Sequence, residues 1–200
     1  MIADRMRSTV LFGAAVAVGL AVVAIFVAVA GVLVGATTGA DPADAFRPAP
    51  IVPADIDEYV LWLDERDELL RPVEPLTRDA VASAWVRADA AARYALEYRD
   101  TRPLQTWFTE GALERAEALL SEPTADTGWS WSGHELRAVF YSVDGRIMGV
   151  EAISTGWIHT DGAVLPVREA RRAVLVLTDG NWRIQRDEVI ETAVGNSTVS

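Results

Sequence analysis

The hydrophobic pattern is dominated by an uninterrupted apolar run near the amino terminus. Residues Val10 to Ala36 include no charged, amide or hydroxyl side chain over 27 positions. A helix of this length reaches roughly 40 Å, more than the ~30 Å hydrocarbon core of a bilayer. The run predicts a transmembrane helix over residues 10–36, preceded by a short tail, 1–9. A cleaved signal peptide is the alternative, but its apolar core would be only about 7 to 15 residues long.

Charges on the two sides of the run predict its orientation. Arg5 and Arg7 precede it, whereas the segment after it is acidic, with Asp41 and Asp44. The positive-inside rule then places the amino terminus in the cytoplasm and the rest of the chain outside, as a single-pass protein of the cell membrane. Gly31 and Gly35 form a GxxxG pattern, which predicts a homodimer through the span unless the spacing arises by chance in a Gly/Ala-rich run.

After the run, the pattern predicts a linker and then helices. Residues 37–55 contain four prolines and little apolar periodicity, which is typical of an extended extracytoplasmic linker. Residues 56–76 hold a short amphipathic helix, Ile56–Leu70, and a Pro-rich connection. The period then predicts a longer helix from Arg78 to Arg99, capped by Thr77, and a third from Glu110 to Leu120, capped by Thr109.

The long helix has an apolar stripe whose members recur at helical spacing. They are Val81, Trp85, Ala88, Ala92 and Ala95 or Leu96. Asp89 and Arg93 form an i,i+4 pair that we expect on the outside, facing water. The segment 121–133 is polar and is expected to be a loop.

The second half changes to a β pattern divided by Asp-Gly dipeptides at 144, 161 and 179. The predicted strands are His134–Val143, Arg146–Thr160, Ala163–Thr178 and Asn181–Glu191. Asp-Gly between such segments favours type I′ hairpin turns, so the four strands form an antiparallel meander. Gly149, Gly156 and Pro166 are expected where the sheet bulges and curves. The predicted fold class is α+β, with helices on a curved four-stranded sheet over residues 77–192 and a flexible tail, 193–200.

Helices followed by a meander that closes on Asp179-Gly180-Asn181-Trp182-Arg183-Ile184 resemble the nuclear transport factor 2-like superfamily, the cone-shaped fold of ketosteroid isomerases. The resemblance covers roughly residues 78–191. The order of tail, span, linker and cone is similar to that of the membrane-anchored mammalian-cell-entry-associated proteins of actinobacteria and of the scaffold subunit of type IV secretion systems.

Composition restricts the classes of partner. The chain has no cysteine, so disulfides and thiolate metal sites are excluded. Its formal net charge is −11. Such an acidic chain argues against binding nucleic acid or anionic lipid headgroups, because both need a basic face. We expect no cofactor.

Candidate chemistry in the cone is sparse. The resemblance implies a carboxylate base beside a Tyr or a protonated acid, and the residues that could supply them are Tyr94, Tyr98, Asp100, Tyr141, Glu151 and Glu169. Tyr residues four apart on a helix are more often part of the cone wall, so we expect Tyr94, Tyr98, Trp85 and Trp182 to line the cavity without catalysis. His134 and His159 have no third ligand at a suitable spacing, and no metal site is predicted.

Partner contacts are predicted at two places. Trp129 and Trp131 lie in a Gly/Ser-rich segment, where exposed Trp favours either a protein interface or a lid on the cone mouth. Arg168, Arg171 and Arg172 form a basic cluster that binds either an anionic partner or the domain's own acidic groups.

The sequence therefore predicts a non-catalytic assembly or scaffold subunit of a bacterial envelope complex of transport or secretion type. The first alternative is a module that binds a small apolar or lipid-like ligand in the cone. The second is a ketosteroid-isomerase-like enzyme. An assembly subunit predicts a filled cone, and a binding module predicts a hollow one.

Overall fold

The computed structural model describes residues 48–65, 69–121, 128–160 and 162–195. The predicted span, 10–36, with Gly31 and Gly35, lies outside these ranges, as do most of the linker and the end of the tail. Within the described ranges, no helix combines the length and apolar character needed to cross a bilayer.

Four long strands form the antiparallel meander predicted from the Asp-Gly dipeptides. They are β2 (Gly128–Tyr141), β3 (Ile147–Thr160), β4 (Ala163–Thr178) and β5 (Asn181–Val194), and each pairs with the next. Positive φ at both central positions, as a type I′ turn requires, is found at Asp179 and Gly180. At the β2–β3 turn only Gly145 has positive φ, and its N–H donates to the carbonyl of Ser142.

A fifth strand corrects the prediction of a helix over 56–70 and of a purely antiparallel sheet. The helix α2 ends after one turn, Ile56–Tyr59, and β1 (Val60–Trp62) then pairs in parallel with β2. Val60 is β-branched, which favours a strand, and it buries its side chain in the core. The Tyr59 hydroxyl also donates to the carbonyl of Trp131 at 2.6 Å, which fixes this segment against β2.

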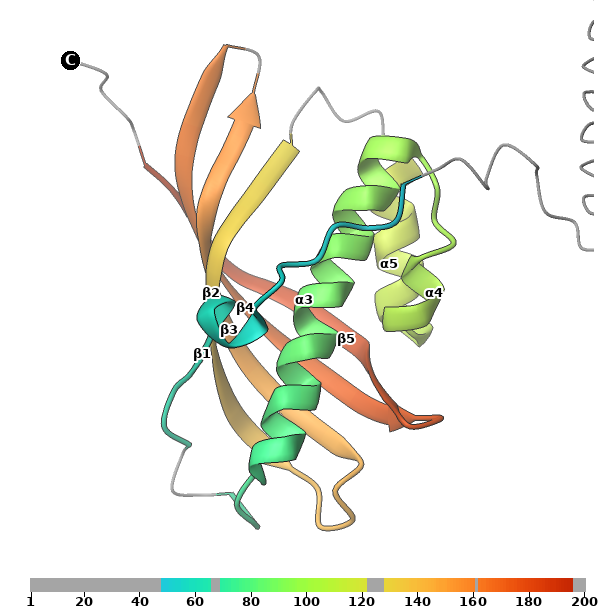
Figure 1. Cartoon of the computed structure of the whole chain (residues 1–200), viewed down its shortest axis with the longest axis vertical. Coiled ribbons are helices and arrows are strands. Elements are labelled where there is room, and N and C mark those ends of the chain that lie inside the picture. Colours follow the sequence, from blue (N-terminus) through green and yellow to red (C-terminus); the bar gives the residue numbers. More distant parts are fainter. Residues whose placement is uncertain (1–47, 66–68, 122–127, 161, 196–200) are drawn as a thin grey trace, which may run out of the picture. The chain divides into compact units, whose positions relative to one another are not determined.

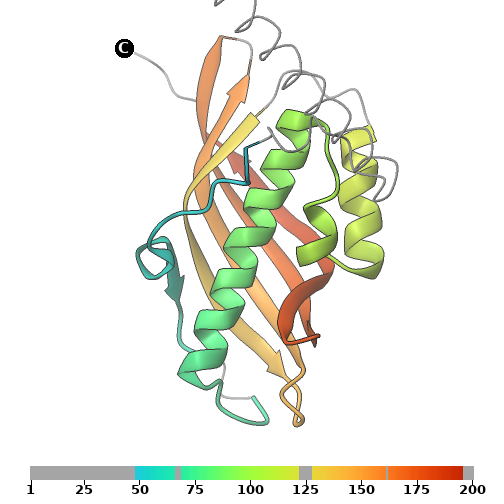
Figure 2. The same cartoon turned by 45° about the vertical axis from the view of Figure 1, so that its right-hand side comes forward.

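Three further helices cover the concave side of the sheet. The longest, α3 (Pro75–Tyr98), crosses the sheet obliquely, with α4 (Leu104–Trp107) and α5 (Glu110–Ser121) beside it (Figure 2). The α3 helix begins three residues earlier than predicted, because Pro75 occupies its first turn, where no backbone N–H donor is needed. Glu74, rather than Thr77, is its N-cap residue.

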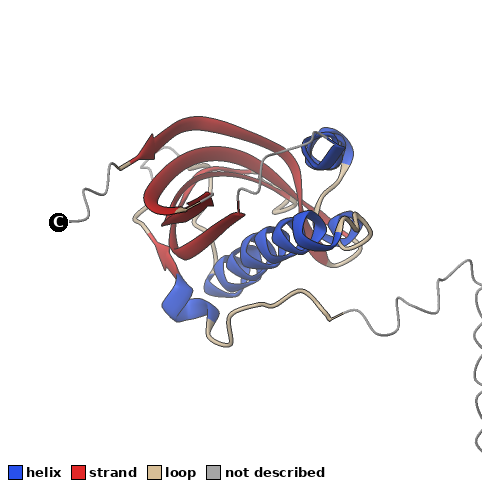
Figure 3. Cartoon of the chain, turned by 90° about the horizontal axis from the view of Figure 1, so that it is seen from above, coloured by secondary structure: helices blue, strands red, loops and turns tan. Residues whose placement is uncertain are grey.

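Bulges on β2 bend the sheet into an arc, with α3 lying across its open side (Figure 3). Each bulge lies opposite a β3 glycine, Gly149 or Gly156, which the sequence analysis associated with curvature. A Cβ at Gly156 would lie 2.1 Å from the Ser130 carbonyl oxygen. Only glycine allows β2 and β3 to approach so closely here.

The core fills one end of the concave face. Leu136, Met148 and Leu175 are fully buried there, with Trp182 among their buried neighbours. Leu136 and Met148 lie toward the β2–β3 turn. The opposite halves of the strands face a space that the side chains leave open.

Candidate functional site

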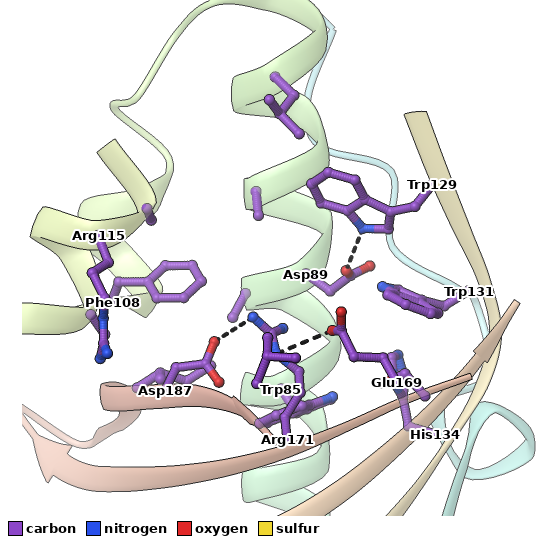
Figure 4. Close-up of a pocket in the computed structure, with 18 of the residues that line it drawn as sticks. Trp85, Asp89, Phe108, Arg115, Trp129, Trp131, His134, Glu169, Arg171 and Asp187 are labelled. Carbon is purple, nitrogen blue, oxygen red and sulfur yellow. Dashed lines mark hydrogen bonds and ion pairs between the residues drawn. The ribbon is translucent and has the colours of Figure 1, made fainter. Parts of the chain in front are cut away.

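A cavity of about 660 Å³ occupies the other end of the concave face, between the helices and the sheet (Figure 4). From α3, α4 and α5 and the segment after α4, it is lined by Trp85, Ala88, Asp89, Ala92, Leu96, Leu104, Phe108, Ala112, Arg115 and Ala116. From the sheet, it is lined by Gly128, Trp129, Trp131, His134, Ser154, Ile158, Val167, Glu169, Arg171, Ile184, Asp187, Glu188 and Val189. Small side chains on α3 leave this space unfilled, and a few polar groups interrupt its mainly apolar wall.

Asp89 connects α3 to the two tryptophans of β2. Its Oδ1 accepts a hydrogen bond from Trp129 Nε1–H at 3.3 Å, and its Oδ2 accepts one from Arg93 Nε–H at 3.0 Å. Both indoles, Trp129 and Trp131, lie beside this carboxylate in Figure 4. Burial raises the pKa of Asp89, although Arg93 and both indole donors oppose the shift. The Asp89–Arg93 pair predicted on the outside is formed, but its carboxylate side chain is only 10% exposed.

Arg171 on β4 holds two acidic side chains inside the cavity. Its guanidinium lies 2.6 Å from Asp187 and 3.4 Å from Glu169. Burial raises the pKa of both carboxyls, while the Arg171 charge works in the opposite direction. A register shift between Val174 and Leu175 leaves an extra residue on β5, so that Asp187 joins Ile184 on the concave side.

His134 is a buried, neutral group in the wall. It is 3% exposed, and its Nδ1 lies 2.7 Å from the Ser154 hydroxyl on the neighbouring strand. Burial, with the nearby charges of Arg171 and Arg93, lowers its pKa to about 4. Its Nε2 is buried and has no hydrogen-bond partner in the described part of the chain. This nitrogen has the capacity for one more hydrogen bond, as donor or acceptor according to the tautomer.

Of the residues predicted to line the cone, Trp85 does so. Tyr94, Tyr98 and Trp182 are outside the lining that the described residues form. Tyr94 and Tyr98 stack on each other instead, with ring centroids 4.6 Å apart, and Trp182 belongs to the packed core.

The residues considered for isomerase chemistry do not meet. Only Glu169 reaches the cavity. Asp100 pairs with Arg102 at 2.6 Å, Glu151 pairs with Arg172 at 2.9 Å, and the Tyr141 hydroxyl donates to Glu74. The expected pairing of a cavity carboxylate with one of these tyrosines is therefore not present among the described residues.

The predicted partner contacts separate into different environments. Trp129 and Trp131 belong to β2 rather than to a loop, and they are half-buried against the cavity. Arg171 faces the cavity, Arg172 pairs with Glu151, and Arg168 is exposed. The alternation of Trp and Ser over 129–132 is a strand signal that the loop prediction overlooked.

Sequence reasoning missed Asp89, His134 and Asp187 as cavity residues. Asp89 follows Trp85 by four positions and precedes Leu96 by seven, so its helical spacing could have placed it on the cavity side. The inward position of the Asp187 side chain depends on a bulge in β5, and no residue type in the sequence predicts that bulge. No group of three or more His, Asp or Glu side chains suited to a metal ion is found within the described ranges.

Comparisons with known proteins do not identify a family. No family model matches the sequence, and no curated protein matches it. The intermembrane-space region of the chloroplast protein ARC6 has a TM-score of 0.47 at 15% identity, over 60% of this chain and 98% of that one.

Two more solved structures are similar at this level. A Nostoc punctiforme protein of unknown function, described as having a cystatin-like fold, has a TM-score of 0.42 at 10% identity, over 64% of this chain and 97% of its own. A hexachlorocyclohexane dehydrochlorinase, LinA type 2, has a TM-score of 0.39 at 13% identity, over 62% of this chain and 95% of its own. The α+β class follows from the described elements themselves. The resemblance to membrane-anchored members of the superfamily stays a prediction.

Proposed function

We propose that the domain formed by residues 50–195 is a binding module that holds a small molecule with an apolar body in its cavity. The observation that carries the proposal is a hollow cone: about 660 Å³ of space lined mainly by apolar and aromatic side chains. Ligand sites in proteins have volumes of about 300 to 1,000 Å³ and carry a few placed polar groups on apolar walls.

The wall is built so that a ligand can be oriented as well as enclosed. Trp85 and Phe108 supply flat apolar surface, and the buried His134 Nε2 supplies a polar atom without a partner among the described residues. A buried polar atom that lacks a hydrogen bond costs about 1 to 3 kcal/mol, so a ligand group that bonds to it gains affinity. The resemblance to a cone-shaped superfamily agrees with a ligand at this position.

The hollow cone favours binding over assembly, for which we expected a filled cone. Trp129, one of the proposed partner contacts, turns its indole N–H to Asp89, inside the domain. An enzyme is supported less well, because no tyrosine among those considered joins Glu169 in the cavity. The membrane span, the extracytoplasmic location and association with envelope proteins stay predictions from the sequence.

A substitution that fills the cavity tests the proposal. Ala92 lies on α3 between Asp89 and Leu96 and lines the space, so an Ala92→Trp side chain would project into it. The full chain, purified in a mild detergent, is titrated calorimetrically with 1-naphthylmethanol, a neutral aromatic probe. We expect saturable binding that Ala92→Trp weakens by at least about tenfold, or 1.4 kcal/mol.

The matched control is Ala80→Trp, at an exposed position of the same helix outside the cavity. It adds the same side chain to the surface and exposes the probe to the same detergent. Equal heats for the wild type and both variants would mean that the probe binds the detergent or the surface, and would contradict a ligand site in the cone.

A further inference from the structure

The charged side chains of the cavity are not paired evenly. Its acidic residues and arginines are Asp89, Arg115, Glu169, Arg171, Asp187 and Glu188. Arg93, outside the lining, balances Asp89. His134 is neutral at pH 7, because its pKa is lowered to about 4. Glu188 follows Asp187 on β5 and pairs in register with Arg172, so its side chain lies on the convex side of the sheet. Among the described residues, Asp89, Glu169 and Asp187 face the cavity, and the last two share Arg171.

The carboxylate with the least complete set of partners is Asp187. Arg171 is shared between this carboxylate and Glu169, and it bonds to Asp187 through Oδ2 at 2.6 Å. Asp187 Oδ1 is buried and has no hydrogen-bond partner among the described residues. Arg115 is near enough to lower the pKa of Asp187, but it occupies an exposed position at the cavity edge. A buried carboxylate oxygen without a donor is a strong site for an N–H group that carries positive charge.

His134 is a second, independent sign that the wall is incomplete without a ligand. The residue is 3% exposed and lines the same cavity, and its Nε2 has no partner in the described chain. In the tautomer that keeps hydrogen on Nδ1, bonded to Ser154, this Nε2 is an acceptor. Asp187 Oδ1 and His134 Nε2 can then both accept from a ligand.

Aromatic side chains surround the open space. Trp85, Phe108, Trp129 and Trp131 all line it. The Trp129 N–H is already bonded to Asp89, so this residue offers a ligand its ring rather than a donor. Aromatic faces attract cations by about 0.5 to 2 kcal/mol each, most strongly where water is excluded.

We propose that the cavity selects organic cations, in particular amines with an aromatic or alicyclic body, whose ammonium donates to Asp187 Oδ1 while the body packs among the tryptophans. This inference rests on the proposed function and names the chemical class of its ligand. The net charge of −11 acts in the same direction, because it raises the local concentration of cations around the chain.

Three probes with the same naphthalene body separate charge from shape: 1-naphthylmethylamine, 1-naphthylmethanol and 1-naphthoate. Each is titrated calorimetrically into the full chain at neutral pH. We expect the amine to bind about tenfold or more tightly than the alcohol, and the carboxylate to bind most weakly. In Asp187→Asn the amine's advantage should fall below about threefold, with the alcohol's affinity unchanged.

Glu191→Gln is the control, because Glu191 is exposed on the same strand, does not line the cavity, and carries the same charge. It should keep the tenfold preference. An equal loss in both variants would indicate long-range attraction only and would overturn the assignment to Asp187. If Asp187→Asn does not fold, Asp187→Ser replaces it, and an unchanged preference for the amine in a folded Asp187 variant would overturn the assignment.

The two proposals fail differently. Equal affinities for amine and alcohol, or tightest binding of 1-naphthoate, would overturn the selection of cations and leave a neutral binding site intact. Absence of binding by all three probes, including the alcohol, would overturn the binding module itself.

Discussion

Arg171→Met is the substitution that most directly probes the charged part of the cavity. It keeps a long side chain but removes the cation between Asp187 and Glu169, whose side chains are 12% and 18% exposed. Removing one partner of a fully buried ion pair costs about 3 to 5 kcal/mol. Because the Arg171 side chain is 30% exposed, solvent screens part of the loss, and we expect about 2 to 3 kcal/mol at pH 7.

The sign of the pH dependence follows from the raised pKa values of Asp187 and Glu169. A carboxyl whose pKa is higher in the folded protein than in the unfolded chain favours folding below the unfolded pKa. That contribution is lost as pH rises through the folded pKa. Without Arg171 both pKa values rise further, so the variant's deficit should be largest near pH 7 and shrink as the pH falls and the carboxyls bind protons.

Urea unfolding of the full chain, followed by Trp emission, measures the deficit. At about 2 kcal/mol per molar urea, a loss of 2 to 3 kcal/mol lowers the midpoint by roughly 1 M. Arg172→Met is the matched control: it is the next residue of β4, its side chain is 59% exposed, and it pairs with Glu151 outside the cavity. That variant should lose no more than about 1 kcal/mol. Equal losses in the two variants, or a deficit for Arg171→Met that does not shrink at acid pH, would refute the reasoning.

Three further predictions concern the walls of the cone. Gly156→Ala should lower the free energy of unfolding in urea by about 2 kcal/mol or more, because its Cβ would lie 2.1 Å from a backbone oxygen of β2. Gly128→Ala, with open space around it, should lower it by less than about 1 kcal/mol. Equal losses would contradict the close approach of β2 and β3. Leu136→Ala, at 0% exposure, should cost about 3 kcal/mol, and Leu61→Ala, at 60%, under about 0.5 kcal/mol by the same measurement. The His134 ring should stay neutral until pH falls to about 4, followed by the ¹⁵N shifts of its imidazole; protonation near pH 6.5 would contradict its burial.

The sequence predicted the sheet well because its turns have a strict chemistry. Asp-Gly at 144, 161 and 179 divided the second half correctly into strands, and the apolar spacing of Val81 and Trp85 predicted α3. The short β1 was missed because Ile56–Leu70 also satisfies a helical period. What decides between the two is a tertiary contact, the parallel pairing of Val60–Trp62 with β2.

The cavity was harder to predict, since it depends on how elements meet rather than on a motif. The pairing of Asp89 with Arg93 was anticipated, but whether that face of α3 meets water or a hollow depends on the curvature of a sheet formed 40 residues later. The inward position of Asp187 depends on a β5 bulge. His134 was noted only as a strand end, because its extent of burial follows from β1 and α3 packing beside it.

The most direct test of a ligand site in the cone follows the indole N–H signals of the tryptophans by ¹H–¹⁵N NMR while 1-naphthylmethanol is added to the full chain. Trp85, Trp129 and Trp131 line the cavity, whereas Trp182 is packed in the core outside it. The account predicts that the first three signals shift together and saturate, and that the Trp182 signal stays in place. Saturating shifts confined to tryptophans outside the cavity, or none at all, would contradict a ligand site within the cone.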